Sequence, residues 1–509
     1  MLDKLVKNII TIISITVFAM CVILSIIYVA SVHNSGEHVL IRLTSGIGVI
    51  SYLVIDLIGI VLLKKIENKI KISKKVKYIL LTGVTLIYLF ISCYWVNNSN
   101  VLPVDDSKAV NDIAVCFAKG DYGALRKNGY IEKYPNQMGT IFVIGSLYKI
   151  FRTTNYRLIQ YANIVANVIT FVFMYLIVKK LNKKYKVSEL AYCIMYLTFV
   201  PLILLTTYVY GDYMGLAFSI LGIYFIIDYK ETKKIYKFIL SAIFMLLSYI
   251  TKMNYLIVIF AILIYLVMYL IQAIEEKNKK SIILNFAGII VFAMISLMPF
   301  SLIKGYCIQK YEYREEQSLP TSVWLYLGMS ESSRASGWYS ELAIEAWNDT
   351  PLSHTTYPEK VKERMKDLIT HPYYAIKFYT IKTVSGWIDP YFQSIWYNVG
   401  LDNKDDIMNN IMNSKRYKLG ELYLKALDLI IYTGALVTVI KNRKNLNNEL
   451  ILLITIFVGG ILFHTMWEMK SRYTLPYIIM LIPVSSIGIQ NIVDKIPNFK
   501  FKKLNENNK

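Results

Sequence analysis

The sequence has 509 residues, of which 55% are hydrophobic and only 18% are charged, and its mean hydropathy is +0.43. The apolar residues form long blocks, which excludes an ordinary soluble domain and predicts an all-α polytopic membrane protein. The formal net charge of +21 does not indicate a nucleic-acid partner, because the lysines are concentrated in short loops between apolar blocks, where they attract anionic headgroups. Five widely separated cysteines indicate neither a disulfide framework nor a zinc cluster.

About twelve apolar blocks are long enough to cross a bilayer. The first follows Lys4 and Lys7, and its length of about 20 residues favours a retained span over a cleaved signal peptide. In chain order, the predicted spans are residues 9–30, 41–63, 78–95, 158–178, 190–209, 213–229, 236–250, 255–270, 282–302, 424–440, 450–467 and 473–492.

The lysine-rich segments between these blocks predict the orientation of the chain. With both termini in the cytoplasm of a bacterial cell, every such segment falls on the cytoplasmic side of the plasma membrane, as the positive-inside rule requires. These segments are residues 64–77, 179–186, 228–237, 275–280, 441–445 and the tail 493–509. The prediction holds only if the apolar segment 140–151 does not cross. Because it has about 12 residues, we expect a helix that lies at the outer interface.

The spans divide the chain into five predicted parts. Two additional N-terminal spans occupy residues 1–77, and a membrane core with a catalytic outer loop at 97–157 occupies residues 78–302. An extracytoplasmic insert follows at 303–423, then C-terminal spans at 424–492 and the cytoplasmic basic tail at 493–509. The insert should be mainly helical, with one helix that begins at Pro358 and stops at the His371–Pro372 pair.

The first outer loop contains "PVDDS", with Asp105 and Asp106 side by side. Adjacent carboxylates repel each other, so at least one should have a raised affinity for a proton, a metal ion or a cationic partner. Either aspartate is therefore a candidate general base. The alternative is a simple turn in which Asp106 or Ser107 caps a helix over residues 109–117.

Two further outer segments supply polar side chains. "YIEKYPNQMG" provides Tyr134, Asn136 and Gln137, which are candidates for an acceptor or substrate pocket, although a plain loop is the alternative. In "VYGDYMG", a glycine pair of the small-xxx-small type precedes and follows Asp212. Close helix packing explains the glycines but does not need the carboxylate, so Asp212 is also a candidate pocket residue.

Three cations are expected at the same outer face. Lys252, in "YITKMNY", lies outside against the positive-inside rule, which indicates either a hairpin tip or a phosphate site. Lys470 and Arg472, in "WEMKSRY", suit a lipid phosphate, and the alternative is ordinary snorkelling to phospholipid. Glu468 shares this turn and is a candidate pocket residue; together with His464 it lacks a visible third metal ligand.

On these residues the chain resembles the lipid-dependent membrane glycosyltransferases of the C superfamily, which include protein O-mannosyltransferases and aminoarabinose transferases. It looks most like the bacterial dolichyl-phosphate-mannose-mannosyltransferase-like branch. The likeness lies in "PVDDS", "YGD", "TKMN" and "KSRY" and covers roughly residues 78–492. Protein mannosyltransferases carry an Asp-Glu pair where this chain has Asp-Asp, which leaves the choice of base and any metal requirement open.

The resemblance implies a polyprenyl-phosphate sugar as donor and an inverting transfer to an extracytoplasmic acceptor, which is a cell-wall polymer, a glycolipid or a protein. Asp105 or Asp106 would take the proton from the acceptor hydroxyl. Lys252, Lys470 and Arg472 would neutralise the donor phosphate as it leaves. Whether a divalent cation, Mg or Mn, is bound at the two aspartates stays open.

A polytopic flippase or transporter for lipid-linked saccharides is the rival interpretation. Such proteins usually carry charges or Gly-Pro breaks at the middle of their spans. Here most spans are apolar in the middle, with Asp56 as an exception, and the polar residues gather at one face. The pattern therefore favours an enzyme that acts at the membrane surface.

Overall fold

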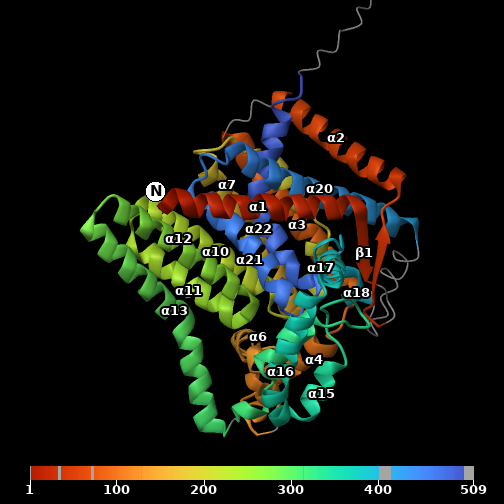
Figure 1. Cartoon of the computed structure of the whole chain (residues 1–509), viewed down its shortest axis with the longest axis vertical. Helices are drawn as coiled ribbons and strands as arrows, with labels where there is room; N and C mark the ends of the chain where they lie inside the picture. Colours follow the sequence, from red (N-terminus) through yellow and green to blue (C-terminus); the bar gives the residue numbers. More distant parts are fainter. Residues whose placement is uncertain are drawn as a thin grey trace, which may run out of the picture.

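A computed structural model describes residues 2–32, 36–69, 74–127, 129–312, 314–399 and 414–497. Over these residues the chain is helical apart from one small sheet, which confirms the predicted all-α polytopic membrane protein (Figure 1). Ten of its helices are long and apolar enough to cross a membrane. They are α1 (Leu2–Ile27), α2 (Gly46–Lys69), α3 (Lys74–Ser99), α7 (Arg157–Leu181), α10 (Asp212–Thr232), α12 (Leu256–Glu275), α13 (Lys279–Tyr311), α20 (Lys415–Asn442), α21 (Asn448–Met466) and α22 (Ser471–Val493).

The other two predicted spans are also helical. Residues 190–209 correspond to a helix pair, α8 (Glu189–Leu197) and α9 (Pro201–Leu204) with the 3-10 turn η3 (Leu205–Thr207), which is bent by 51°. Residues 236–250 correspond to α11 (Ile235–Thr251), an apolar helix of 17 residues. Each of the twelve apolar blocks of the sequence is thus mainly helical, while residues 498–509 of the predicted tail lie outside the described residues.

The bend between α8 and α9 is possible because side chains of α7 satisfy the backbone that the break leaves open. Pro201 begins α9 and cannot donate a hydrogen bond. Asn167 Nδ2 donates to the carbonyl of Leu202 (3.1 Å), and Asn163 Nδ2 donates to the carbonyls of Thr206 (3.0 Å) and Tyr208 (2.9 Å). Non-helical backbone at membrane depth needs such partners. The bend delivers residues 208–212 to the outer end of the bundle.

A two-stranded antiparallel hairpin, β1 (Tyr28–Val32) and β2 (Val39–Leu43), joins α1 to α2. The predicted spans 9–30 and 41–63 are therefore wrong at these ends, since α1 stops at Ile27 and α2 starts at Gly46. Eight of the ten strand residues are apolar, so hydropathy does not separate them from the spans, although four of them are β-branched, a type that favours strands.

The lysine-rich ends of the spans lie together at one end of the bundle. Contacts between side chains join the last turns of α7, α10, α12 and α22 and the first turn of α1. They are Lys180–Asp228 (2.6 Å), Lys186–Asp494 (2.7 Å) and Gln272–Asp3 (3.1 Å). The hairpin and the elements of the first outer loop and the insert lie at the opposite end (Figure 1).

The first outer loop is built from short helices that rest on the bundle. They are α4 (Asp105–Ala118), η1 (Gly123–Leu125), α5 (Tyr130–Lys133), η2 (Pro135–Gln137) and α6 (Met138–Phe151). Thr140 Oγ1 donates to the carbonyl of Thr251 (2.6 Å), at the end of α11, and Gly139 meets the backbone of Ile250 so closely that no side chain fits. Tyr148 donates to Asn111 of α4 (2.6 Å). Thus α6 packs across the end of a span and is too short to form one.

The insert contributes η5 (Glu315–Gln317), α14 (Thr321–Met329), α15 (Leu342–Asn348), α16 (Thr350–Thr370), α17 (Pro372–Trp387) and α18 (Ser394–Val399). Its last part enters the bundle. The Trp387 ring packs on Phe457 of α21 (5.2 Å between centroids) and Tyr477 of α22 (5.9 Å), and Tyr432 of α20 donates to the Trp387 carbonyl (2.8 Å). The predicted insert at 303–423 is therefore not wholly outside the bundle, and α13 extends past residue 302 to Tyr311.

Helix α22 lies at the centre of the bundle. In its most apolar window 94% of the residues are buried, against 17% in α2 and in α13. The peripheral helices expose Ile and Leu side chains, as surfaces in contact with lipid do. The first turn of α22 therefore places its side chains in the interior, just where the bundle meets the outer elements.

Candidate active site

A buried carboxylate, Asp212, is the first residue of α10 and joins two cations. Arg472 Nη1 lies 2.6 Å from Asp212 Oδ2, and Lys252 forms an ion pair with the other carboxylate oxygen. Arg472 is the second residue of α22, and Lys252 follows α11. Close packing brings these elements together, because a Cβ on Gly211 would lie 2.2 Å from the Thr251 carbonyl oxygen. Gly211 therefore allows close packing, and the neighbouring Asp212 is still available for a functional role, so the two predictions for this segment are compatible.

Tyrosine rings enclose the two cations. The Arg472 guanidinium lies 4.5 Å from the ring centroid of Tyr208, 4.9 Å from that of Tyr397 and 5.1 Å from that of Tyr473. Lys252 Nζ lies 5.0 Å from the same Tyr473 ring. Aromatic faces attract cations, most strongly where water is excluded. The rings therefore stabilise the positive charges of Arg472 and Lys252 without occupying all of their N–H donors.

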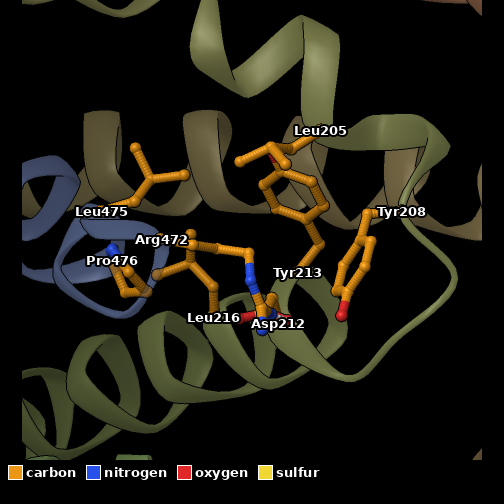
Figure 2. Close-up of a pocket in the computed structure, with 8 residues that line it drawn as sticks. All are labelled: Leu205, Tyr208, Asp212, Tyr213, Leu216, Arg472, Leu475 and Pro476. Carbon is orange, nitrogen blue, oxygen red and sulfur yellow. Dashed lines mark hydrogen bonds and ion pairs between the residues drawn. The ribbon is translucent and has the colours of Figure 1, made fainter. Parts of the chain in front are cut away.

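A pocket opens beside this ion pair (Figure 2). Figure 2 shows Arg472 reaching from α22 toward Asp212. The lining residues are Leu205, Tyr208, Asp212, Tyr213, Leu216, Arg472, Leu475 and Pro476. Within the described part of the chain, the buried Nε of Arg472 has no hydrogen-bond partner. An apolar wall with one incompletely paired guanidinium suits a ligand that has an anionic group and an apolar portion.

Lys470 belongs to a different cluster. Its Nζ lies 2.7 Å from Glu37 Oε1, at the tip of the N-terminal hairpin, and Arg334 of the insert pairs with the other oxygen of Glu37. Gln393 Nε2 also donates to Glu37 (2.9 Å). Burial acts to raise the pKa of Glu37, but Lys470 and Arg334 outweigh it and hold that pKa below its usual value. The three predicted phosphate-binding cations therefore occupy two clusters.

The acidic pair lies at the start of α4, and both side chains are exposed. The prediction that Asp106 or Ser107 caps a helix over residues 109–117 is wrong, because the helix begins at Asp105 and its N-cap is Val104. Ser107 lies in the first turn, where its Oγ accepts from the Val104 backbone N–H (3.0 Å) and donates to the Val104 carbonyl (2.7 Å). Among the described residues, neither Asp105 nor Asp106 makes a hydrogen bond or ion pair through its carboxylate. The helix start therefore leaves both carboxylates available to a ligand.

Electrostatic interactions connect the acidic pair with its surroundings. Partial shielding from water and the charge of Asp106 raise the pKa of Asp105, Glu37 raises it further, and Lys470 and Arg334 oppose them. Burial and, in addition, the charge of Asp106 raise the pKa of several tyrosines. These tyrosines are Tyr130, Tyr134, Tyr208, Tyr210 and Tyr339.

The predicted pocket residues downstream have different surroundings. Tyr134 packs edge-on against Trp347 of the insert (4.6 Å between centroids), and Gln137 donates to the Tyr210 hydroxyl. Asn136 is exposed and makes no hydrogen bond to another described residue. Gln137 thus contacts Tyr210, whose ring centroid lies 5.2 Å from Lys252 Nζ and 5.4 Å from the Arg472 guanidinium. Tyr134 connects the loop to the insert, and nothing places Asn136 in the site.

Glu468 is buried in the connection between α21 and α22. Burial, partly opposed by Lys470 and by Lys382 of α17, raises the pKa of Glu468 to about 7. Its backbone N–H donates to the Trp324 carbonyl of α14 (3.1 Å). No group of three His, Cys, Asp or Glu side chains suited to a metal ion occurs within the described ranges, so the pair of His464 and Glu468 gains no third ligand.

Sequence reasoning missed four residues that complete these clusters. Glu37, Arg334 and Gln393 surround Lys470, and Lys382 braces the backbone that precedes it. Each lies in a segment that resembles an ordinary polar turn or helix. Lys382 offers the one signal that was available, since a lysine near the apolar end of α17 needs buried acceptors.

A comparison with protein families adds a finding to this geometry. Residues 138–300 match the family model described as dolichyl-phosphate-mannose-protein mannosyltransferase. No curated protein matches the chain. The matched segment contains Asp212 and Lys252, whereas Asp105, Asp106 and Arg472 lie outside it.

The many apolar helices and the charged site at one end define a multi-pass membrane protein with polar chemistry at its surface. The family match over residues 138–300 confirms the predicted resemblance to membrane glycosyltransferases of the C-superfamily type, the group that includes mannosyltransferases.

Proposed function

We propose that the protein transfers a sugar from a polyprenyl-phosphate donor to an extracytoplasmic acceptor, which is a cell-wall polymer, a glycolipid or a protein. The observation that carries the proposal is the pairing of free carboxylates with enclosed cations at one end of the bundle. The charges of Lys470 and Arg334 act on Asp105, and the charge of Asp106 acts on Tyr208, which lines the Arg472 pocket. In a bacterial plasma membrane with cytoplasmic termini, this end faces outward.

The reaction uses the two kinds of charge in different ways. Asp105 or Asp106 accepts the proton of the acceptor hydroxyl as its oxygen forms a bond to the anomeric carbon of the donor. The bond from that carbon to the phosphate oxygen breaks on the opposite face, the bonding electrons leave with polyprenyl phosphate, and the configuration inverts. Positive charge at Arg472 and Lys252 stabilises the negative charge that develops on the departing phosphate.

The carboxylate partners of the cations set how strongly they bind a donor. Asp212 is shared by Lys252 and Arg472, so this cluster carries one net positive charge. The proposed donor is a phosphodiester that joins a sugar to a prenyl chain, so it carries one negative charge and complements the charge of this cluster. Gln137 and Glu468 stay proposed pocket residues, because Gln137 contacts Tyr210 and Glu468 lies in the connection between α21 and α22, which carries Lys470.

The acidic pair by itself offers two carboxylate ligands to an ion such as Mg or Mn. Among the described residues, no third His, Cys, Asp or Glu side chain joins them in a metal-binding group. The carboxylate of Asp105 or Asp106 accepts the proton directly.

Replacing Asp105 and Asp106 singly by Asn tests the general base. We expect the essential variant to lose at least about 100-fold in transfer from a radiolabelled polyprenyl-phosphate sugar, because general-base catalysis contributes on this order. Asp112→Asn, an exposed acid of the same helix, should keep activity. Full activity in both test variants would exclude the proposed base. Labelled lipid that crosses vesicles unaltered would favour the flippase instead.

A further inference from the structure

The hairpin of the two N-terminal spans reaches into the site from outside the segment that matches the family model. The backbone N–H of Val39 donates to the Arg334 carbonyl (2.9 Å), and His38 Nδ1 donates to the Ser333 carbonyl (2.7 Å). The hairpin is therefore hydrogen-bonded to the insert at Arg334 itself and at the residue before it. These contacts fix the position of Glu37, the residue directly before His38, relative to the insert.

Glu37 connects three parts of the chain at this point. Its side chain is 3% exposed and lies between Lys470 of the α21–α22 connection and Arg334 of the insert. Gln393, ahead of α18, donates to the same carboxylate (2.9 Å). Two cations that would otherwise repel each other are thus held together by one acid. The remaining net charge of the cluster is one positive unit, as in the Asp212 cluster.

We propose that Glu37 is a positioning residue of the active site: it holds Lys470 and Arg334 beside the acidic pair, and the N-terminal hairpin completes the site. This inference rests on the proposed function, because it assumes that an aspartate of the pair is the base. Glu37 itself touches neither donor nor acceptor in this scheme. It acts through the two cations that it fixes.

The charges around Asp105 give the inference a signature that a purely structural role would lack. Asp106 and Glu37 favour the protonated form of Asp105, whereas Lys470 and Arg334 favour the carboxylate. Glu468, Tyr397 and Tyr339 also face the Glu37 cluster, and the Tyr339 ring lies 5.1 Å from the Arg334 guanidinium and 5.9 Å from Lys470 Nζ. Removing Glu37 and removing Arg334 should therefore shift the pKa of Asp105 in opposite directions.

The experiment compares pH profiles of kcat/KM for transfer from a radiolabelled polyprenyl-phosphate sugar by the full-length protein in detergent. Transfer requires the carboxylate form, so activity falls as pH drops through the pKa of the base. Glu37→Gln should move this acidic limb to lower pH by about half a unit, and Arg334→Gln should move it to higher pH by a similar amount. The double variant should return the limb close to its original position.

Arg42→Gln is the matched control. Arg42 lies on the same hairpin and pairs with Glu421 (3.0 Å), but this pair is not among the charges that act on Asp105. The control should leave the acidic limb in place. Glu37→Gln leaves two cations without their acid, and if it does not fold, Arg334→Gln still carries the test, since Arg334 is partly exposed.

The possible outcomes separate this inference from the proposed function. One contrary result is an acidic limb of the pH profile that stays in place in Glu37→Gln and Arg334→Gln, and another is a limb that moves in the same direction in both. Either result overturns the role of Glu37, even when the aspartate variants are inactive. Transfer that survives in both Asp105→Asn and Asp106→Asn excludes the proposed base, whereas an unaltered protein that transfers no sugar from the polyprenyl-phosphate donor overturns the proposed function itself. Opposite shifts with an unmoved control support both.

Discussion

Asp212 shows how one side chain keeps two buried cations charged. Burial lowers the pKa of Lys252 to about 8, and the charge of Asp212 opposes that decrease. Arg472 depends on the same carboxylate and is only 3% exposed. The cost of removing a charge from water is repaid only where an opposite charge is fixed nearby. Asp212 therefore belongs to the anion-binding machinery although it is itself an acid.

Asp212→Asn should lower the free energy of unfolding by about 3 to 5 kcal/mol, because it leaves two buried cations without their counter-charge. Thermal unfolding in detergent measures the loss. Asp112→Asn is the control, since the pair of Asp112 with Lys108 is exposed and should contribute less than about 1 kcal/mol. Equal unfolding temperatures for the two variants would show that Asp212 is not a structural counter-ion.

At this scale the sequence identifies isolated charges but not their partners. Asp212, Lys252 and Arg472 are visible because each interrupts an apolar pattern at the outer end of a span. Because Lys470 and Arg472 are close in sequence, the sequence predicts one shared phosphate site for both. The actual partner of Lys470, Glu37, is 433 residues away, and no local pattern connects the two.

The insert acts as an element that grips the connection between α21 and α22. Lys382 of α17 donates to the carbonyls of Thr465 (3.0 Å) and Trp467 (2.9 Å) and to that of Gly328 in α14. Only a protonated lysine has three N–H donors for three acceptors. The position of Lys470 thus depends on two helices of the insert.

Gly328→Ala tests this grip. A Cβ at Gly328 would lie 2.2 Å from the Met466 carbonyl oxygen and 2.3 Å from the Trp467 carbonyl carbon, so α14 or the connection must move. We expect at least about a tenfold loss in kcat/KM for transfer, since displacements near 1 Å are costly to catalysis. Gly305→Ala in α13 meets nothing within 4 Å and serves as the control. Unchanged transfer in Gly328→Ala would argue against the grip.

Elements are predictable from the sequence where lipid imposes the pattern, and less so outside it. The long apolar blocks all became helices, because lipid demands continuous apolarity and internal hydrogen bonds. In the insert, however, the prediction that a helix begins at Pro358 is wrong. Helix α16 begins at Thr350, where Asp349 accepts from the Leu352 N–H (3.1 Å), and Pro358 lies inside it. Both prolines of this segment are compatible with a helix start, and the capping hydrogen bond of Asp349 sets the start at the first of them.

For the molecule as a whole, the separation of charge between its two ends is the main organising feature. Lysines at one end pair with acids of neighbouring spans, as Lys180 does with Asp228, while the other end carries the acidic pair and the enclosed cations. The sequence predicts this polarity from its loops alone. It does not reveal that α22 is central, because burial among other helices and exposure to lipid both require apolar residues.

Cysteine labelling of intact cells tests the orientation. Cys116 of α4 is exposed, whereas Cys21, Cys193 and Cys307 are buried. A membrane-impermeant maleimide should label Cys116 without permeabilisation, and Cys116→Ser should remove the signal. A cysteine at Lys234, between α10 and α11, should react only after lysis. Labelling of Cys116 only in lysed cells would reverse the orientation and place the site in the cytoplasm.

The entry of the α17 end into the bundle has a consequence for biogenesis. Trp387 is enclosed by α20, α21 and α22, which are all synthesised after it. When residue 387 leaves the ribosome, its binding partners do not yet exist, so a large aromatic surface must wait uncovered at the outer membrane surface. The bundle can therefore enclose Trp387 only after the last span has been inserted. A nascent chain arrested before α22 should be a substrate for quality-control proteases.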